Sequence, residues 1–250
     1  MNLSFRQKLT IIPLLVYWFL IFTSTHIPVP QLVCKAGVWD KNLHFLAYFV
    51  LVFLLWFAIS PDKKVNWRKV AAWWVLFVVV WYGVIDEVLQ GYVGRTPDFW
   101  DFFADLVGAI AGLILFSFVS FWPAFLAVTG IAIFFSTNLT HVNPFELLPI
   151  TDDVFCLFAY GVFTAIWLWC IHNFLPATRP LRPKWLITAI ALPTGLLAFV
   201  KSFSAILGRG YRLEDAPISL AAIAIVVIIA ALAALYFPGG PAIRRPDGSI

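Results

Sequence analysis

Residues that could act as acids, bases or cations recur at helical spacing in the first half of the chain. Asp40, His44 and Tyr48 lie four positions apart and therefore share one helical face, and Lys41 follows Asp40 directly. An imidazole carries protons near neutral pH, and a carboxylate such as Asp40 can orient it. A lysine beside them can bind an anion such as phosphate. This group predicts proton transfer next to an anionic substrate.

Two further stretches add carboxylates. Asp86 and Glu87 are adjacent, and Gln90 lies three positions after Glu87 on the same helical face. Arg95 lies in a turn-like segment that leads to a second run of acids. These acids are spaced three and four positions apart: Asp98, Asp101 and Asp105. Two neighbouring carboxylates can divide the work of acid and base in glycosyl chemistry.

We expect these side chains to converge in one pocket with two kinds of role. The candidate catalytic residues are Asp40, His44, Asp86, Glu87 and Asp101. The candidate substrate-binding residues are Lys41, Tyr48, Gln90, Arg95, Asp98 and Asp105. The alternative is that they are ordinary solvated loop charges. Acids and a histidine that recur on single helical faces favour the pocket.

The sequence assigns no metal ligands, and the cofactor stays open. Three cysteines form no CxxC pair and no metal spacing: Cys34, Cys156 and Cys170. No His-x-x-x-His or cysteine cluster supports zinc. Several acids with one histidine can nevertheless bind a divalent cation through oxygen ligands.

The composition excludes a soluble or a disordered protein. Hydrophobic residues make up 62% of the 250 residues and charged residues 12%, against about 25% charged residues in soluble domains. The net charge of +4 is dispersed among apolar runs and forms no nucleic-acid patch. Membrane lipids are therefore the predicted surroundings.

Eight stretches are apolar and long enough to be membrane spans. They lie at about 9–25, 42–60, 69–87, 101–119, 122–137, 153–172, 185–204 and 216–237. The fourth and fifth nearly touch, so one long broken helix is the alternative there. The fourth also carries small residues at every fourth position, which let a neighbouring helix approach closely: Ala104, Gly108 and Gly112. The predicted fold is an all-α polytopic membrane bundle.

Charge placement predicts the orientation. With the N-terminus in the cytoplasm, 11 of the 17 basic residues face the cytoplasm, while 11 of the 13 acids lie on the other side. The excess of basic residues on cytoplasmic segments favours cytoplasmic N- and C-termini. We interpret the first apolar stretch as an uncleaved span rather than a signal peptide.

The chain also repeats itself weakly. A shift of 112 aligns 21–26 with 133–138 and Asp40 with Asp152, and a shift of 114 aligns Asp101 with Asp215. We therefore predict two parallel four-helix repeats, residues 1–120 and 121–250. In the second copy His44 is replaced by Cys156 and Glu87 by Lys201. The second copy cannot run the same acid–base chemistry and is predicted to support the first.

The polar residues in their order resemble the VanZ-like family of bacterial membrane proteins over about residues 8–120. The resemblance rests on Asp40-Lys41-x-x-His44, Tyr48, Asp86-Glu87-x-x-Gln90, Arg95, Asp98, Asp101, Asp105 and Gly108. Where many members carry Asn, this chain carries Asp105. The best-known member is linked to teicoplanin resistance. The resemblance thus implies a multi-pass protein of the bacterial cytoplasmic membrane with an effect on glycopeptide susceptibility.

Three classes of function fit these features. The first is an enzyme that acts on a cell-envelope lipid or lipid-linked glycan at the outer leaflet. The second is a lipid or amphiphile transporter or flippase, which the parallel repeats favour and the absence of a mid-span acid or base disfavours. The third is a binding protein that captures a glycopeptide or a lipid-linked envelope precursor without turnover. A change in the mass of a lipid would distinguish the enzyme from the other two.

Overall fold

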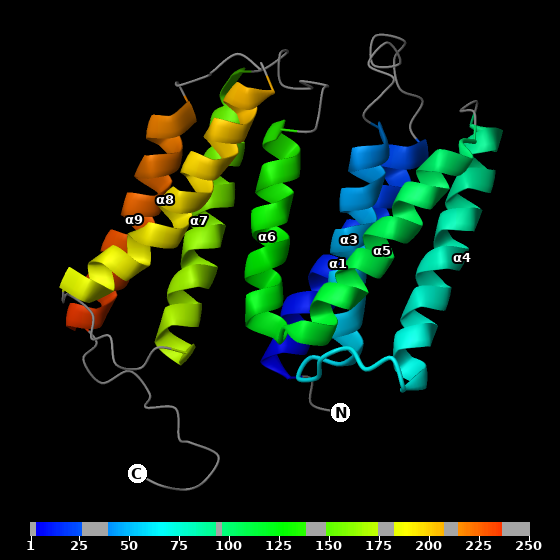
Figure 1. The fold of residues 1–250 in the computed structure, drawn as a ribbon, viewed down its shortest axis with the longest axis horizontal. Helices are drawn as coiled ribbons and strands as arrows, with labels where there is room; N and C mark the ends of the chain where they lie inside the picture. Colours follow the sequence, from blue (N-terminus) through cyan, green and yellow to red (C-terminus); the bar gives the residue numbers. More distant parts are fainter. Residues whose placement is uncertain are drawn as a thin grey trace, which may run out of the picture. The chain divides into compact units, whose positions relative to one another are not determined.

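A computed structural model describes residues 4–26, 40–93, 97–138, 149–174, 183–207 and 215–236, without the side chains of residues 40, 149–152, 173–174 and 215. Within these ranges the chain forms eight α-helices and no strand, and every helix is long and apolar enough to cross a membrane. The helices are α1 (Phe5–His26), α3 (Asp40–Ile59), α4 (Val70–Tyr92), α5 (Phe99–Phe118), α6 (Phe121–Asn138), α7 (Pro149–Phe174), α8 (Pro183–Ile206) and α9 (Asp215–Tyr236) (Figure 1). The predicted all-α membrane fold and its eight spans are confirmed.

The fourth and fifth spans are two helices rather than one long broken helix. Helix α5 ends at Phe118, and Val119 is extended, with φ −113° and ψ 149°. Helix α6 begins at Phe121, so Pro123 lies in its first turn. Proline is tolerated there because the first backbone N–H groups of a helix have no intrahelical partner.

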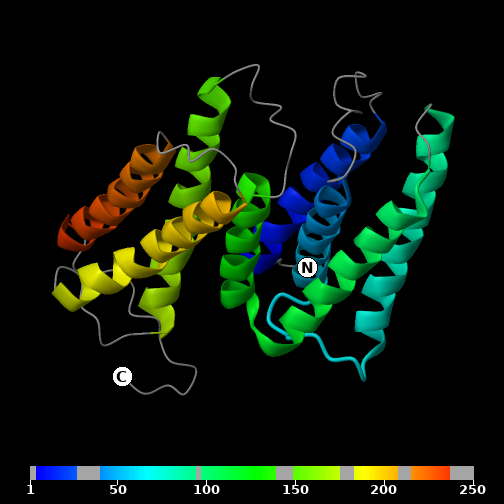
Figure 2. The same cartoon turned by 45° about the horizontal axis from the view of Figure 1, so that its top comes forward.

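The helices form two compact units, residues 1–147 and 148–250. In the first unit α3 is central and packs against α1, α4, α5 and α6 (Figure 1, Figure 2). In the second unit α7, α8 and α9 pack against one another. Helix α6, which the sequence assigns to the second repeat, belongs to the first unit. The internal repeat and its boundary stay predictions.

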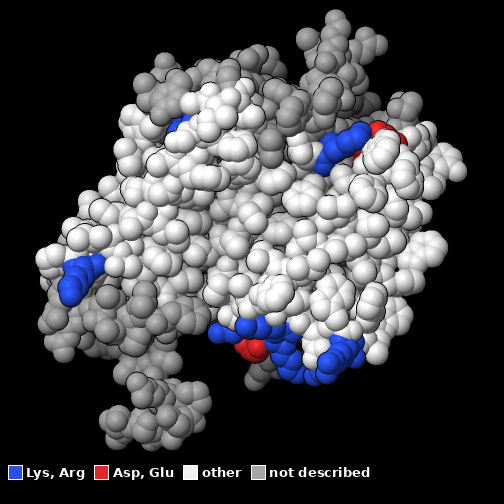
Figure 3. Space-filling view, viewed as in Figure 1, with Lys and Arg blue, Asp and Glu red and all other residues white. Residues whose placement is uncertain are grey.

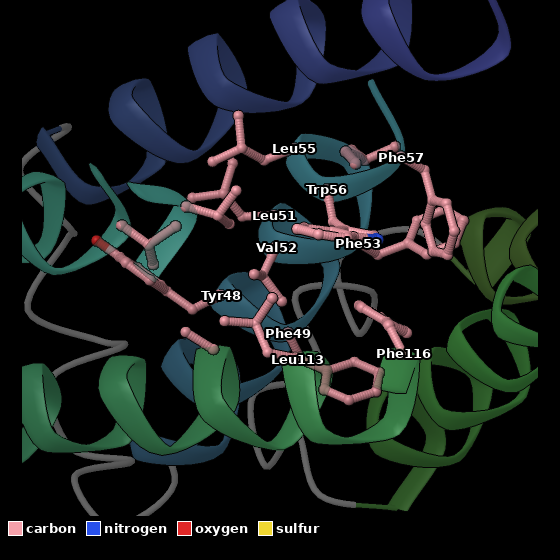
Figure 4. Packing of buried hydrophobic residues seen from close by; sticks show 14 of the residues in the cluster. Tyr48, Phe49, Leu51, Val52, Phe53, Leu55, Trp56, Phe57, Leu113 and Phe116 are labelled. Carbon is pink, nitrogen blue, oxygen red and sulfur yellow. The ribbon is translucent and has the colours of Figure 1, made fainter. Parts of the chain in front are cut away.

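The core of the first unit lies along the middle of α3. Figure 4 shows α3 side chains, including Val52 and Phe53, beside Leu113 and Phe116 of α5. The rings of Phe53 and Phe116 meet edge to face with their centroids 5.7 Å apart. Because these side chains are buried, their contact holds α3 and α5 side by side.

Two glycines let the backbones of α3 and α5 come unusually close. A Cβ atom on Gly108 would overlap the carbonyl oxygen of Phe45, and one on Gly112 would lie 2.5 Å from Val52 Cγ1. The predicted close approach along the small-residue stripe is confirmed at these two positions. This contact sets the depth at which polar residues near the start of α3 and α5 face each other.

The end of the first unit formed by the start of α1 and the α3–α4 loop is basic. Arg6 of α1 pairs with Asp62 in that loop at 2.7 Å. The same loop carries four more basic residues: Lys63, Lys64, Arg68 and Lys69. Figure 3 shows these basic side chains gathered at this end. The described polar residues singled out by the sequence lie toward the helix ends opposite to it.

Candidate functional site

Helix ends from four spans meet at one end of the first unit. Helices α1 and α4 run in one direction and α3 and α5 in the other, so two C-terminal ends meet two N-terminal ends (Figure 1). We call the described polar residues at these ends the polar cluster. Its members are Thr25, His26, Lys41, His44, Asp86, Glu87, Gln90, Asp98, Asp101 and Asp105. The convergence follows because α3 packs against a parallel helix, α5, and two antiparallel helices, α1 and α4.

The outer part of the cluster is a partly exposed ion pair. Lys41 Nζ lies 2.9 Å from Asp98 Oδ2 and 3.4 Å from Asp101 Oδ1. Asp98 also caps α5, because its side chain accepts a hydrogen bond from the backbone N–H of Trp100. The bond from Trp100 and then the bond from Lys41 hold the pKa of Asp98 below its ordinary value. Asp98 therefore stays ionised at neutral pH.

Below this ion pair, His44 lies against two carboxylates of α5. Its ring Nδ1–H donates to Asp105 Oδ1 at 2.9 Å, and its Nε2 lies 3.9 Å from Asp101 Oδ2. All three residues are buried. Asp101 and Asp105 can both face His44 because residues four apart share one face of α5. This arrangement suits proton transfer between an imidazole and a carboxylate.

Glu87 comes to the same place from α4. Its Oε2 accepts a hydrogen bond from the backbone N–H of Asp98 at 3.1 Å. Its Oε1 is buried and has no hydrogen-bond partner among the described residues, and the same holds for Asp105 Oδ2. One side-chain atom each from His44, Glu87 and Asp105 lie within 4.8 Å of one another. Each of the three residues thus places an atom that could bind a metal ion or a proton near a common point.

Asp86 is held by two neutral partners. Thr25 Oγ1 donates to its Oδ1 at 2.9 Å, and Gln90 Nε2 donates to its Oδ2 at 2.9 Å. His26 Nδ1 lies 3.7 Å from the same carboxylate. Thr25 and His26 were not among the predicted site residues. Their sequence signal was a polar pair at the end of the first span, which packing of α1 against α3 and α4 brings to the cluster.

Tyr48 lies deeper than the other predicted binding residues. Its side chain is 1% exposed, and its hydroxyl has no partner among the described residues. The ring packs against Tyr82 of α4, with their centroids 5.9 Å apart. The space next to Gly83 accommodates this hydroxyl, which lies 3.5 Å from the position of a Cβ there. Two parts of the predicted site lie outside the residues that the structure describes: Arg95 and the side chain of Asp40.

Residues 2–121 match the model of the VanZ/LLP1 family. Over these residues the chain is VanZ-like. A search of curated proteins and a search of solved structures each found no match.

The VanZ-like match coincides with the helices that build the polar cluster. It begins before α1 and ends at Phe121, the first residue of α6. The resemblance inferred over residues 8–120 is thereby confirmed. Every VanZ-like helix contributes at least one side chain to the cluster, from Thr25 on α1 to Asp105 on α5.

The VanZ-like unit also has an apolar hollow, and no residue of the polar cluster lines it. It has a volume of about 450 Å³ and is lined by the first half of α4, including Trp73, Trp74 and Phe77. None of its lining residues is ionisable. Its exposed aromatic side chains suit contact with lipid chains.

Proposed function

We propose that the polar cluster performs acid–base chemistry on the head group of a cell-envelope lipid or lipid-linked glycan at the outer leaflet. The observation that carries this proposal is the buried hydrogen bond between His44 and Asp105 beside Glu87, whose Oε1 has no described partner. In hydrolysis, a carboxylate would accept a proton from the attacking water. A protonated carboxyl group of the cluster would give a proton to the leaving oxygen. The attacking water thus loses one proton and the leaving oxygen gains one.

The partly exposed ion pair of Lys41 with Asp98 and Asp101 forms the rim of the cluster. This rim offers a binding position for an anionic head group. Lys41 is the described cation at this end, and its side chain is 44% exposed. It can therefore turn toward a phosphate while Asp98 and Asp101 remain near it. Arg95, which lies three positions before Asp98 in the sequence, is the second cation predicted for this site. A lipid would approach with its chains along the apolar helix faces and its head group at the cluster.

Lipid mass spectrometry tests the enzymatic proposal. Purified protein in nanodiscs is incubated with total envelope lipids, and one lipid class is expected to change mass. Glu87→Gln keeps the side-chain volume and is expected to slow the reaction at least about 100-fold. Asp62→Asn, at the basic end of the unit, is the matched control and should keep the full rate. Conversion by Glu87→Gln at the rate of the control would refute the proposed role.

The same preparation separates the other two function classes. Redistribution of a lipid between leaflets of a proteoliposome without a change in mass would identify a flippase. Stoichiometric binding of a glycopeptide or envelope precursor that survives loss of Asp86 and Glu87 would identify a binder. For glycopeptide susceptibility, we expect expression of the protein to change the inhibitory concentration of teicoplanin, and Glu87→Gln to abolish the change.

The outer-leaflet location depends on the orientation that the basic residues indicate. Pro97 at the cluster end and Lys63 at the basic end are both exposed. In a background whose native cysteines are replaced by serine, an impermeant maleimide should label Pro97→Cys on intact cells. Lys63→Cys should react only after permeabilisation. The reverse pattern would move the chemistry to the cytoplasmic leaflet.

A further inference from the structure

The polar cluster buries more carboxylates than its described cations can neutralise. Asp86, Glu87, Asp101 and Asp105 are all buried, and the nearest lysine, Lys41, lies at the rim. An ionised carboxylate without a charged partner is costly to bury in an apolar medium. Hydrogen bonds from Thr25 and Gln90 satisfy Asp86, and Lys41 reaches Asp101. Glu87 and Asp105 remain with one oxygen each that has no described partner.

Those two residues converge with an imidazole. Glu87 is 8% exposed, Asp105 2% and His44 6%, and one potential ligand atom from each lies within 4.8 Å of the others. Two carboxylate oxygens and one imidazole nitrogen form a donor set for a divalent metal ion. We propose that His44, Glu87 and Asp105 bind a divalent transition-metal ion, with Mn²⁺ as the best match.

The donor types select the class of ion. Carboxylate oxygens suit Mg²⁺, Ca²⁺ and Mn²⁺, whereas imidazole suits transition metals. Mn²⁺ accepts both kinds of donor, and two carboxylates offset its charge of two. Three protein ligands also leave coordination positions for water or for an oxygen of a substrate.

Neighbouring hydrogen bonds already hold the ligands in place. Asp105 Oδ1 accepts from His44, which orients the imidazole and leaves Asp105 Oδ2 for the ion. Glu87 Oε2 is held by the backbone N–H of Asp98, which leaves Oε1 in the same way. Each carboxylate thus has one oxygen for positioning and one for coordination.

The spacing of these residues along the chain explains why the set could not be found as a motif. His44 lies on α3, Glu87 on α4 and Asp105 on α5, so no two ligands share a helix. Metal motifs that are recognisable in sequence place at least two ligands a few positions apart. Here the close contact of α3 and α5 at Gly108 brings the three helices together.

A titration with Mn²⁺ tests the site directly. Full-length protein is purified, stripped with a chelator and titrated with Mn²⁺, and the electron paramagnetic resonance signal of the free ion reports binding. We expect one Mn²⁺ per chain. Glu87→Gln and Asp105→Asn keep side-chain size and should each weaken binding at least tenfold. Asp62→Asn should bind as the natural chain does. Absence of saturable binding, or binding that both cluster variants retain, would overturn the proposal.

A second measurement identifies the ligand on α3. Pulsed electron paramagnetic resonance of bound Mn²⁺ should detect coupling to one imidazole nitrogen, and His44→Gln should remove it. Bound Mn²⁺ without nitrogen coupling would refute the proposed donor set. The result is independent of turnover. Mn²⁺ binding without any lipid conversion would support this metal site and refute the enzymatic function. Full lipid conversion by protein that binds no Mn²⁺ would support the enzymatic function and refute this metal site.

Discussion

The two units use the same kind of helix but bury different polar residues. In the first unit, α3, α4 and α5 bury one histidine, four acids and one amide in the polar cluster. In the second unit, the buried polar residues among those described are Thr164 and Ser219, both neutral. Helices α7, α8 and α9 nevertheless pack into a compact unit. Helices of this kind therefore do not need buried acids in order to pack.

The repeat predicted from the sequence allows this difference to be compared at individual positions of the two units. A shift of 114 pairs Asp86 with Val200 and Asp105 with Ser219, and Val200 and Ser219 are 0% exposed. In the second unit, the two buried positions that correspond to these acids are thus occupied by an apolar and a small neutral side chain. Because buried charge lowers stability unless it is paired, the acids of the first unit point to a role other than packing.

The largest expected effect concerns the close contact between helices. Gly108→Ala should force α3 and α5 apart and lower the free energy of unfolding by about 3 kcal/mol or more, because the added Cβ meets backbone atoms. Gly195→Ala in α8 is the matched control, since a Cβ there meets nothing within 4 Å. That variant should be neutral or more stable by up to about 1 kcal/mol. Denaturation in detergent compares the two, and equal stability would contradict the close approach.

An exchange of buried side chains gives the next largest effect. Ser219→Asp should lower the free energy of unfolding by more than about 2 kcal/mol, because a fully buried carboxylate must lose its hydration. Ser219→Asn controls for side-chain size. If the charged and neutral variants are equally stable, burial of an acid is not what separates the units.

The reciprocal change in the first unit should be mild. Asp105→Asn keeps an oxygen that can accept from His44 and removes a buried charge. In metal-free buffer its free energy of unfolding should therefore change by no more than about 1 kcal/mol. Thermal denaturation with and without Mn²⁺ measures this, and Mn²⁺ should stabilise only the natural chain. A large loss without metal would make Asp105 a structural residue.

The smallest effect is expected at the rim. Lys41→Met removes the partner of Asp98, an exposed pair of the kind that adds little stability. The pKa of Asp98 lies below its ordinary value, so any contribution of the pair is present above that ordinary value. It is lost as the pH falls through the lowered pKa. Melting temperatures of both proteins between pH 7 and pH 3 should converge at the acid end, and a gap that widens there would contradict this.

Much of the fold and part of the site could be predicted because both depend on local periodicity. Apolar length predicted every span, and spacing of three and four placed Asp101 with Asp105 on one face. That Asp40 orients His44 stays a prediction because the side chain of Asp40 is not described, and the contact of His44 with Asp105 on α5 had no signal in the sequence. Thr25 and His26 were missed because a polar pair at a helix end has no chemical signature by itself.

The sequence by itself determined which residues share a helical face and how many spans the chain makes. Both follow from the geometry of one helix, in which residue number sets the angle and height of each side chain. Only the tertiary structure decided that His44, Glu87 and Asp105 meet and that Asp86 belongs with Thr25 and Gln90. Those contacts depend on the rotation and axial offset between helices. Side-chain volume sets these two quantities, above all the missing Cβ of Gly108 against Phe45.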